Sequence, residues 1–422
     1  MMFKKVVLKN GLRILTVPQK TTRAVTVLVL VGSGSKYEEK EKSGISHFLE
    51  HMFFKGTKKR PSSLAIAETL DKVGGIYNGF TSKDYTGYFA KVAKEHFELA
   101  LDWVADIFLN SILPEKEIEK ERGVIIEEIN MRKDHPIEHV QTLWHQLLYG
   151  DQPAGWDIAG SVETVSKITR QDLIKFREKH YIAKNTIVCL AGNFDQKTGI
   201  EKVKKYFSKI KEGKLPQKPK VIEKQNSPAF LIEERKTDQT HLCLGVRTFN
   251  LFHPSRYAQE ILALVLGGMM SSRLFETIRT KLGIAYYVDT EVYLDPDSGY
   301  LVTRAGLDNE KVLTGILAIL KEYKKIKKEG ISKGELKKAK DCLKGKMTLL
   351  LESSDALASF YASQEVLEKK ILSPEQIFEK IEKVSQKDIL KLAREIFRPE
   401  RLNLAMIGQF DSKKTLKKIL KI

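Results

Sequence analysis

The chain has 422 residues, of which 42% are hydrophobic and 30% are charged, a balance typical of soluble globular proteins with room for two to four domains. The formal net charge is +18. The excess lysines are scattered over loops and helix faces without an aromatic-interleaved basic stripe, so we expect no nucleic-acid partner. No run of about 18 apolar residues is present, which excludes a predicted transmembrane helix, and we expect no membrane partner.

The N-terminal residues predict a pair of short strands. Residues 1–18 alternate around an Asn10-Gly11 turn and do not resemble a signal peptide. Three scattered cysteines, Cys189, Cys243 and Cys342, indicate reduced thiols rather than a disulfide framework or a cysteine-rich zinc site. We therefore expect a cytoplasmic protein.

The next predicted elements are a strand over residues 24–32, which is rich in valine, and a helix that contains SHFLEHMFF (46–54). Ser43 is a candidate N-cap of this helix, and Gly56 falls where a C′ glycine would end it. The apolar residues share one face at helical spacing, so the two histidines are predicted to lie on the other face.

This helix carries the pattern H-x-x-E-H. His47 and His51 are four residues apart and therefore neighbours on one face, with Glu50 beside them. Two imidazoles that hold zinc, with a carboxylate close enough to take a proton from the attacking water, are what a metallopeptidase needs. A solvated or structural histidine pair remains the alternative at this point.

Residues 74–92, GGIYNGFTSKDYTGYFAKV, alternate polar and aromatic residues between glycines and predict a strand or hairpin with an accessible edge. Residues 114–134 predict a second helix, beginning at Pro114. On this helix Glu121 and Glu128 are seven residues apart and share a face, while Glu127 points about 100° away. A catalytic zinc needs a third protein ligand, and both Glu127 and Glu128 remain candidates, as does a purely solvated acidic face.

Three segments together resemble the pitrilysin family of zinc metallopeptidases, which includes insulin-degrading enzyme and the mitochondrial processing peptidases. They are GISHFLEHMFFKGTKKRP (44–61), GGIYNGFTSKDYTGY (74–88) and ERGVIIEEI (121–129). In the family motif, about 76 residues intervene between H-x-x-E-H and a glutamate ligand. Counted from His51, that spacing selects Glu128 rather than Glu127.

The resemblance implies a role for each matching position. His47, His51 and Glu128 would bind one zinc ion per chain, and Glu50 would be the general base. Glu121 would support a ligand from behind, as carboxylates around metal sites commonly do. The resemblance also implies two substrate-binding residues, Asn78 and Phe54. Asn78 lies on the strand that would receive the peptide. Phe54 would line a pocket for apolar residues, or else it would pack in the core.

The chain contains an internal repeat at an offset of 216 residues. ITRQDLIKFREKHYIAKNTIVCLAGNFD (168–195) corresponds to VSQKDILKLAREIFRPERLNLAMIGQFD (384–411), and each begins with a Ser or Thr three residues before Asp. We therefore expect an α+β protein of two homologous halves, each with a mixed or antiparallel sheet flanked by helices. The expected boundaries are residues 1–212 for the zinc-binding half, 213–228 for a linker and 229–422 for the second half.

The second half has no H-x-x-E-H motif, so it is expected to lack the metal site and to complete the active site in another way. SSRLFETIRTKLGIAYYV (271–288) resembles the family's C-terminal contribution, in which an arginine and a tyrosine seven residues later act at the zinc. Here these are Arg279 and Tyr286. Both side chains can donate hydrogen bonds to an oxyanion or a substrate carbonyl. Without the resemblance they would be a surface arginine and a strand tyrosine.

The predicted function is a zinc-dependent endopeptidase that hydrolyses peptide bonds in unfolded peptides, presequences or small extended proteins. The alternative is a non-catalytic, processing-peptidase-like subunit of a heteromeric complex, against which the intact set of His47, Glu50, His51 and Glu128 argues. The family's smaller chains form pairs, so we expect a homodimer, or a heterodimer with a related subunit.

Overall fold

The computed structural model describes residues 3–409, 416 and 418–422 of the chain. It divides into two compact units, and each is described by itself. The first unit contains residues 1–130, 156–219 and 348–374, and the second contains residues 131–155, 220–347 and 375–422. Each half of the sequence therefore contributes one segment to the unit built mainly by the other half. The division into 1–212, 213–228 and 229–422 stays a prediction.

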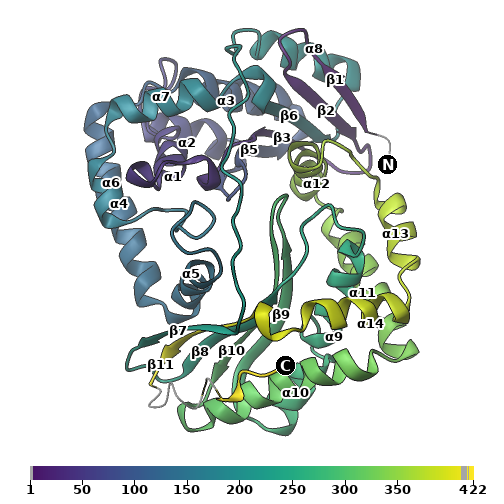
Figure 1. Ribbon diagram of the computed structural model, residues 1–422. Helices are drawn as coiled ribbons and strands as arrows, with labels where there is room; N and C mark the ends of the chain where they lie inside the picture. The colour runs from purple at the N-terminus through teal and green to yellow at the C-terminus, as the bar shows by residue number, and fades with distance from the viewer. Residues whose placement is uncertain (1–2, 410–415, 417) are drawn as a thin grey trace. The chain divides into compact units, whose positions relative to one another are not determined.

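The first unit is built on a mixed six-stranded sheet with the order β1-β2-β6-β3-β5-β4 (Figure 1). Its strands are β1 (Lys4–Val7), β2 (Arg13–Pro18), β3 (Ala24–Val31), β4 (Ile76–Thr81), β5 (Thr86–Ala93) and β6 (Thr186–Gly192). Its helices are α1 (Ile45–Met52), α2 (Ser63–Asp71), α3 (Phe97–Asn110), α4 (Glu115–Asp134), α6 (Val162–Lys167), α7 (Arg170–His180), α8 (Gln196–Tyr206) and α12 (Ser354–Leu367).

Helices cover both faces of the first sheet. Val25, Val27 and Val29 of β3 share a hydrophobic core with residues of α1 and α3. Thr26, between them, forms a 2.8 Å hydrogen bond with Ser354 of α12. Successive side chains of a strand point to opposite faces, so α12 lies on the face opposite α1 and α3.

The second unit is built on a mixed five-stranded sheet with the order β7-β11-β8-β10-β9. Its strands are β7 (Ala229–Glu234), β8 (Thr240–Arg247), β9 (Ala285–Leu294), β10 (Gly299–Leu307) and β11 (Leu402–Gly408). Its helices are α5 (Pro136–Tyr149), α9 (Arg256–Leu266), a π-helix (Phe275–Lys281), α10 (Val312–Glu329), α11 (Lys333–Leu350), α13 (Pro374–Glu382) and α14 (Gln386–Ile396).

Apart from β1, the strands of the first sheet correspond in order and direction to those of the second. In the first, β2 pairs parallel with β6, and β3, β5 and β4 follow antiparallel. In the second, β7 pairs parallel with β11, and β8, β10 and β9 follow antiparallel. Helices α7 and α14 are also 216 residues apart, and the capping boxes Thr169/Asp172 and Ser385/Asp388 are both formed. The α+β class and the two homologous halves are confirmed; Phe410 and Asp411 of the repeat lie outside the described residues.

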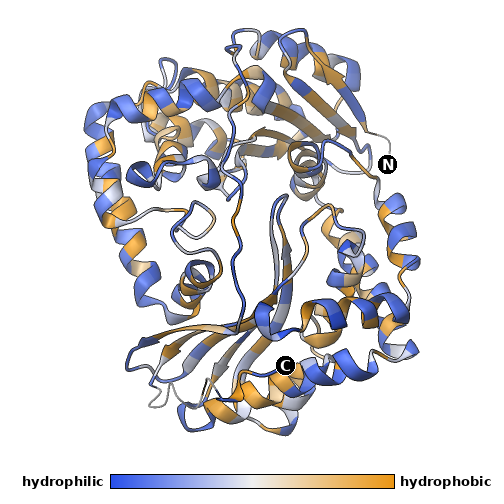
Figure 2. Ribbon diagram, viewed as in Figure 1, coloured by the Kyte–Doolittle hydropathy of each residue, from blue (hydrophilic) through white to orange (hydrophobic). Residues whose placement is uncertain are grey.

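The apolar residues are concentrated along the strands of both sheets, whereas α4 is largely hydrophilic (Figure 2). The segment from residue 211 to residue 228 forms no helix or strand. Over the described part of the chain, no helix combines the length and the apolar character needed to cross a membrane.

Candidate metal centre

Helix α1 begins differently from the prediction. Its N-cap is Gly44, in the left-handed conformation with φ 95°, and not Ser43. The carboxylate of Glu38 accepts hydrogen bonds from the backbone N–H groups of Gly44 (2.8 Å) and Ser46 (2.9 Å). The prediction of Ser43 was wrong because a buried carboxylate from the preceding loop caps the helix instead. The carboxylate of Glu38 also lies at the positive end of the dipole of α1, where a negative charge is favourable.

Three potential ligand atoms converge between α1 and α4. Nε2 of His47 lies 3.2 Å from Nε2 of His51, and Oε2 of Glu128 lies 3.6 and 3.8 Å from these two nitrogens. Ligands placed tetrahedrally at ordinary Zn–N and Zn–O distances are about 3.3–3.5 Å from one another. Two histidines and one glutamate are also a donor set of known catalytic zinc sites. The residues present therefore fit a zinc ion.

Glu121 lies behind one of these histidines. Its Oε1 is 2.8 Å from Nδ1 of His51, and its Oε2 is 2.5 Å from Nζ of Lys55. Burial alone would raise the pKa of the Glu121 carboxyl, but the hydrogen bonds from His51 and Lys55 outweigh it and lower that pKa. With its proton on Nδ1, His51 keeps the lone pair of Nε2 for a metal.

Helix α4 presents the two candidate ligands differently. Glu128 is half-buried and faces α1, whereas Glu127 is exposed. Two successive residues on a helix point about 100° apart, so only one can join the histidines. The structure brings Glu128 to them, as expected from the spacing.

Glu50 lies on the same helix, between the two histidines, and only 8% of it is exposed. Its Oε2 accepts a hydrogen bond of 2.6 Å from the hydroxyl of Thr81, the last residue of β4. A carboxylate beside two convergent imidazoles and at the end of a strand is suitably placed for proton transfer. Neither Thr81 nor Glu38 was predicted; strand alternation places Thr81 on one face with Tyr77 but does not say which helix that face meets.

The two expected substrate-binding residues differ in their surroundings. Asn78 is exposed on β4, and β4 is an edge strand of its sheet. Phe54 is half-buried, with its ring 6.3 Å from that of Tyr88 and 6.0 Å from that of Trp103. Phe54 therefore packs against the core on one side and keeps part of its surface accessible.

In the second unit, Arg279 and Tyr286 lie close together. The Arg279 guanidinium is 4.9 Å from the ring centre of Phe275 and 5.9 Å from that of Tyr286. Arg279 belongs to a π-helix, a rare element that is frequent at functional sites, and Tyr286 is 75% exposed.

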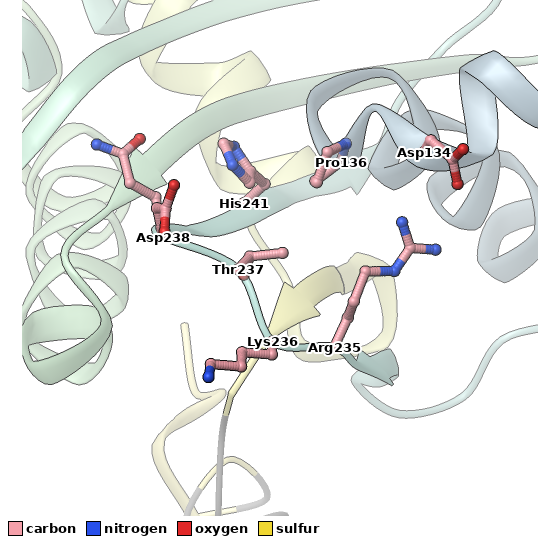
Figure 3. Close-up of a pocket in the computed structure, with 8 residues that line it drawn as sticks. Asp134, Pro136, Arg235, Lys236, Thr237, Asp238 and His241 are labelled. Carbon is pink, nitrogen blue, oxygen red and sulfur yellow. The ribbon is translucent and has the colours of Figure 1, made fainter.

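The second unit also contains a pocket of about 550 Å³ that the sequence did not predict (Figure 3). The acidic side chains of Asp134 and Asp238 are balanced by the basic side chains of Arg235 and Lys236, so the pocket favours neither an anion nor a cation. It is lined by Asp134, Pro136, Arg235, Lys236, Thr237, Asp238, Gln239 and His241.

Comparison with known families agrees with this geometry. Residues 13–161 match the insulinase family (peptidase family M16), and residues 167–343 match the peptidase M16 inactive domain. The uncharacterized zinc protease YmxG of Bacillus subtilis is 36% identical over 410 residues, which cover 96% of this chain and 98% of that protein.

Solved structures share the fold over almost the whole chain. A protease from Helicobacter pylori superposes with a TM-score of 0.90 at 27% identity, covering 96% of this chain and 99% of that one. A chain of complex III2 from Candida albicans has a TM-score of 0.85 at 18% identity, covering 99% of this chain and 100% of that one. The second likeness is one of fold alone.

Proposed function

Because this chain belongs to the insulinase family of zinc proteases (peptidase family M16), we propose that it is an endopeptidase that cleaves extended, unfolded peptides. The observation that carries the proposal is the convergence of His47, His51 and Glu128 beside the carboxylate of Glu50.

The proposed metal site holds one zinc ion per chain, with His47, His51 and Glu128 as its ligands. Zinc bound there would polarise the substrate carbonyl and lower the pKa of a water molecule. The hydrogen bond between Glu121 and Nδ1 of His51 keeps that imidazole in the tautomer able to bind a metal.

Glu50 is the proposed general base. Its carboxylate takes a proton from the attacking water and later delivers it to the leaving amine. The hydroxyl of Thr81 holds one of its oxygens, so the carboxylate needs little reorganisation before proton transfer.

Strand β4 is the proposed docking edge for the substrate. An edge strand offers unpaired backbone N–H and C=O groups, and an extended peptide can pair with them as an added strand. This mode requires an unfolded substrate, and Asn78 and Phe54 would contact its side chains. Arg279 and Tyr286 are proposed to donate hydrogen bonds to the carbonyl under attack.

The alternative of a non-catalytic subunit receives support only from the fold shared with the Candida albicans complex III2 chain. The donor set of the metal centre is intact, which favours the enzyme. We also propose that the chain forms a dimer, and the mass in solution by light scattering tests this.

The experiment that tests the proposal measures zinc and hydrolysis on the same samples. The purified protein should contain about one zinc per chain and should cleave a long, internally quenched peptide. Removal of the metal with a chelator should abolish cleavage, and zinc should restore it. Cleavage that survives complete removal of the metal, or a zinc-loaded protein inert towards a broad peptide library, would contradict the proposal.

A further inference from the structure

One face of strand β4 contacts helix α1. Tyr77, Gly79 and Thr81 alternate along the strand and lie on the same face. Tyr77 packs its ring 5.1 Å from that of Trp103 in the core, and Thr81 bonds Glu50. The last residue on the face of β4 that points to α1, Thr81, therefore contacts the carboxylate of Glu50.

Gly79 allows the strand to come this close. A Cβ atom at this position would lie 2.9 Å from Cγ of Glu50, 3.0 Å from the ring of Phe54 and 3.1 Å from Oε1 of Glu50. Real Cβ atoms avoid such distances, so the backbone of β4 lies directly against the side chain of Glu50. The base is enclosed by the strand as well as by its own helix.

The hydrogen bond from Thr81 orients the carboxylate of Glu50, which packing against Gly79 alone would leave free to rotate. The last torsion of a glutamate is broad and roughly two-fold, so packing against the Cγ atom alone does not orient the carboxylate. The Oγ1–Oε2 distance of 2.6 Å is in the range of a charge-assisted O–H···O⁻ bond. Thr81 is itself restricted at χ1, because it is β-branched and lies in a strand.

We propose that Thr81 is a positioning residue for Glu50: its hydroxyl holds the carboxylate in the orientation that accepts the proton from the attacking water. The inference rests on the proposed function and deepens it. The strand that receives the substrate backbone then also sets the geometry of the base. Peptide binding along β4 and proton transfer at Glu50 share one structural element.

Substitution of the hydroxyl alone tests the proposal. Thr81→Val keeps the shape and the β-branch but removes the donor. It should lower kcat on the order of 10- to 100-fold, with KM within about twofold of the wild type and zinc content unchanged. Thr81→Ser, which keeps the hydroxyl, should recover most of kcat.

Thr86→Val is the matched control. Thr86 is the register partner of Thr81 on β5, and its hydroxyl donates to the backbone oxygen of Ser33 rather than to Glu50. Thr86→Val removes a buried hydrogen bond from the same strand pair, so it should lower the melting temperature but leave kcat within about twofold. An equal loss of kcat in both valine variants would attribute the effect to the sheet and overturn the proposal.

A crystal structure of the zinc-loaded Thr81→Val protein gives a readout that does not depend on activity. The Glu50 carboxylate should occupy two or more orientations, against one in the wild type and in Thr81→Ser. One unchanged orientation, an unchanged kcat, or a Thr81→Ser variant as slow as Thr81→Val would each overturn the inference. If the wild type shows no zinc-dependent cleavage, the proposed function fails, while the orientation of Glu50 still decides the role of Thr81.

Discussion

Nδ1 of His51 lies 2.8 Å from Oε1 of Glu121, so one proposed zinc ligand is held from behind by a carboxylate on another helix. Glu121 comes one heptad before Glu128, and a seven-residue step returns to nearly the same helix face. A single stripe on α4 thus provides both the proposed third ligand and a carboxylate that holds His51, a proposed ligand from α1.

Removal of the charge of Glu121 should weaken zinc binding. We expect Glu121→Gln to raise the dissociation constant for zinc about 10- to 100-fold, the usual effect of losing such a partner. Competition with a chromogenic chelator measures it. Glu117→Gln is the control, because Glu117 lies one turn earlier on α4 and pairs with Lys120 instead. Equal losses in the two variants would point to a general effect of charge on α4.

The choice between adjacent glutamates gives a second prediction. Glu128→Gln should reduce the zinc bound after gel filtration to a small fraction of one per chain, because it removes an anionic ligand oxygen. Glu127→Gln should retain zinc at the wild-type level, since Glu127 is exposed on another face. If only the Glu127 variant lost zinc, the assignment of the ligand would be wrong.

The sequence predicted the regular parts of this site well, because they follow from periodicity. The spacing of four between His47 and His51, and of seven between Glu121 and Glu128, places side chains on one helix face whatever the fold. Which of Glu127 and Glu128 faces the histidines required either the family spacing or the packing of α4 on α1. Propensity within α4 does not distinguish them.

Contacts between distant segments were not predictable in the same way. Glu38 caps α1 because the loop that precedes α1 folds back onto the start of the helix. No local sequence pattern predicts this contact. The segment 348–374 lies in the second half of the chain, yet α12 packs on the sheet of the first unit. A fragment that ended at residue 212 would therefore lack a helix that covers its own sheet.

The buried cap of α1 predicts a pH dependence of stability. Burial raises the pKa of Glu38 to about 7, and the hydrogen bonds from Gly44 and Ser46 and the charge of Lys83 offset this only partly. Between the reference value of 4.5 and about 7, the folded state holds a proton that the unfolded state has lost. The contribution of Glu38 to the free energy of unfolding is therefore largest at low pH and declines as the pH rises through this window.

Denaturant unfolding of the wild type and Glu38→Gln at pH 5 and pH 8 measures this contribution. From pH 8 to pH 5, the free energy of unfolding of the wild type should rise relative to that of the variant. The expected rise is up to about 3 kcal/mol, at 1.36 kcal/mol per pKa unit. Glu41→Gln, in the same loop but exposed, should show no such change. A difference between wild type and Glu38→Gln that is independent of pH would contradict the raised pKa.

The second half provides a prediction about the transition state. Tyr286→Phe removes one hydroxyl from a residue that is 75% exposed, so folding and zinc content should be unchanged. If the hydroxyl stabilises the oxyanion, kcat should fall on the order of 10²–10³ with little change in KM. Tyr293→Phe, on the same strand with its hydroxyl bonded to Glu291, should keep wild-type turnover. Normal kinetics in Tyr286→Phe would leave Tyr286 as a strand residue without a catalytic role.

The central claim is that the carboxylate of Glu50 acts as the base beside a zinc ion held by His47, His51 and Glu128. The most direct test is the rate of cleavage of a quenched peptide by Glu50→Gln, with zinc measured in the same sample. Glutamine has nearly the same shape but cannot take a proton at neutral pH, and Glu50 is not among the proposed ligands. We predict zinc at the wild-type level and a turnover lower by on the order of 10²–10⁴. Near-normal turnover in the zinc-loaded variant would contradict the account.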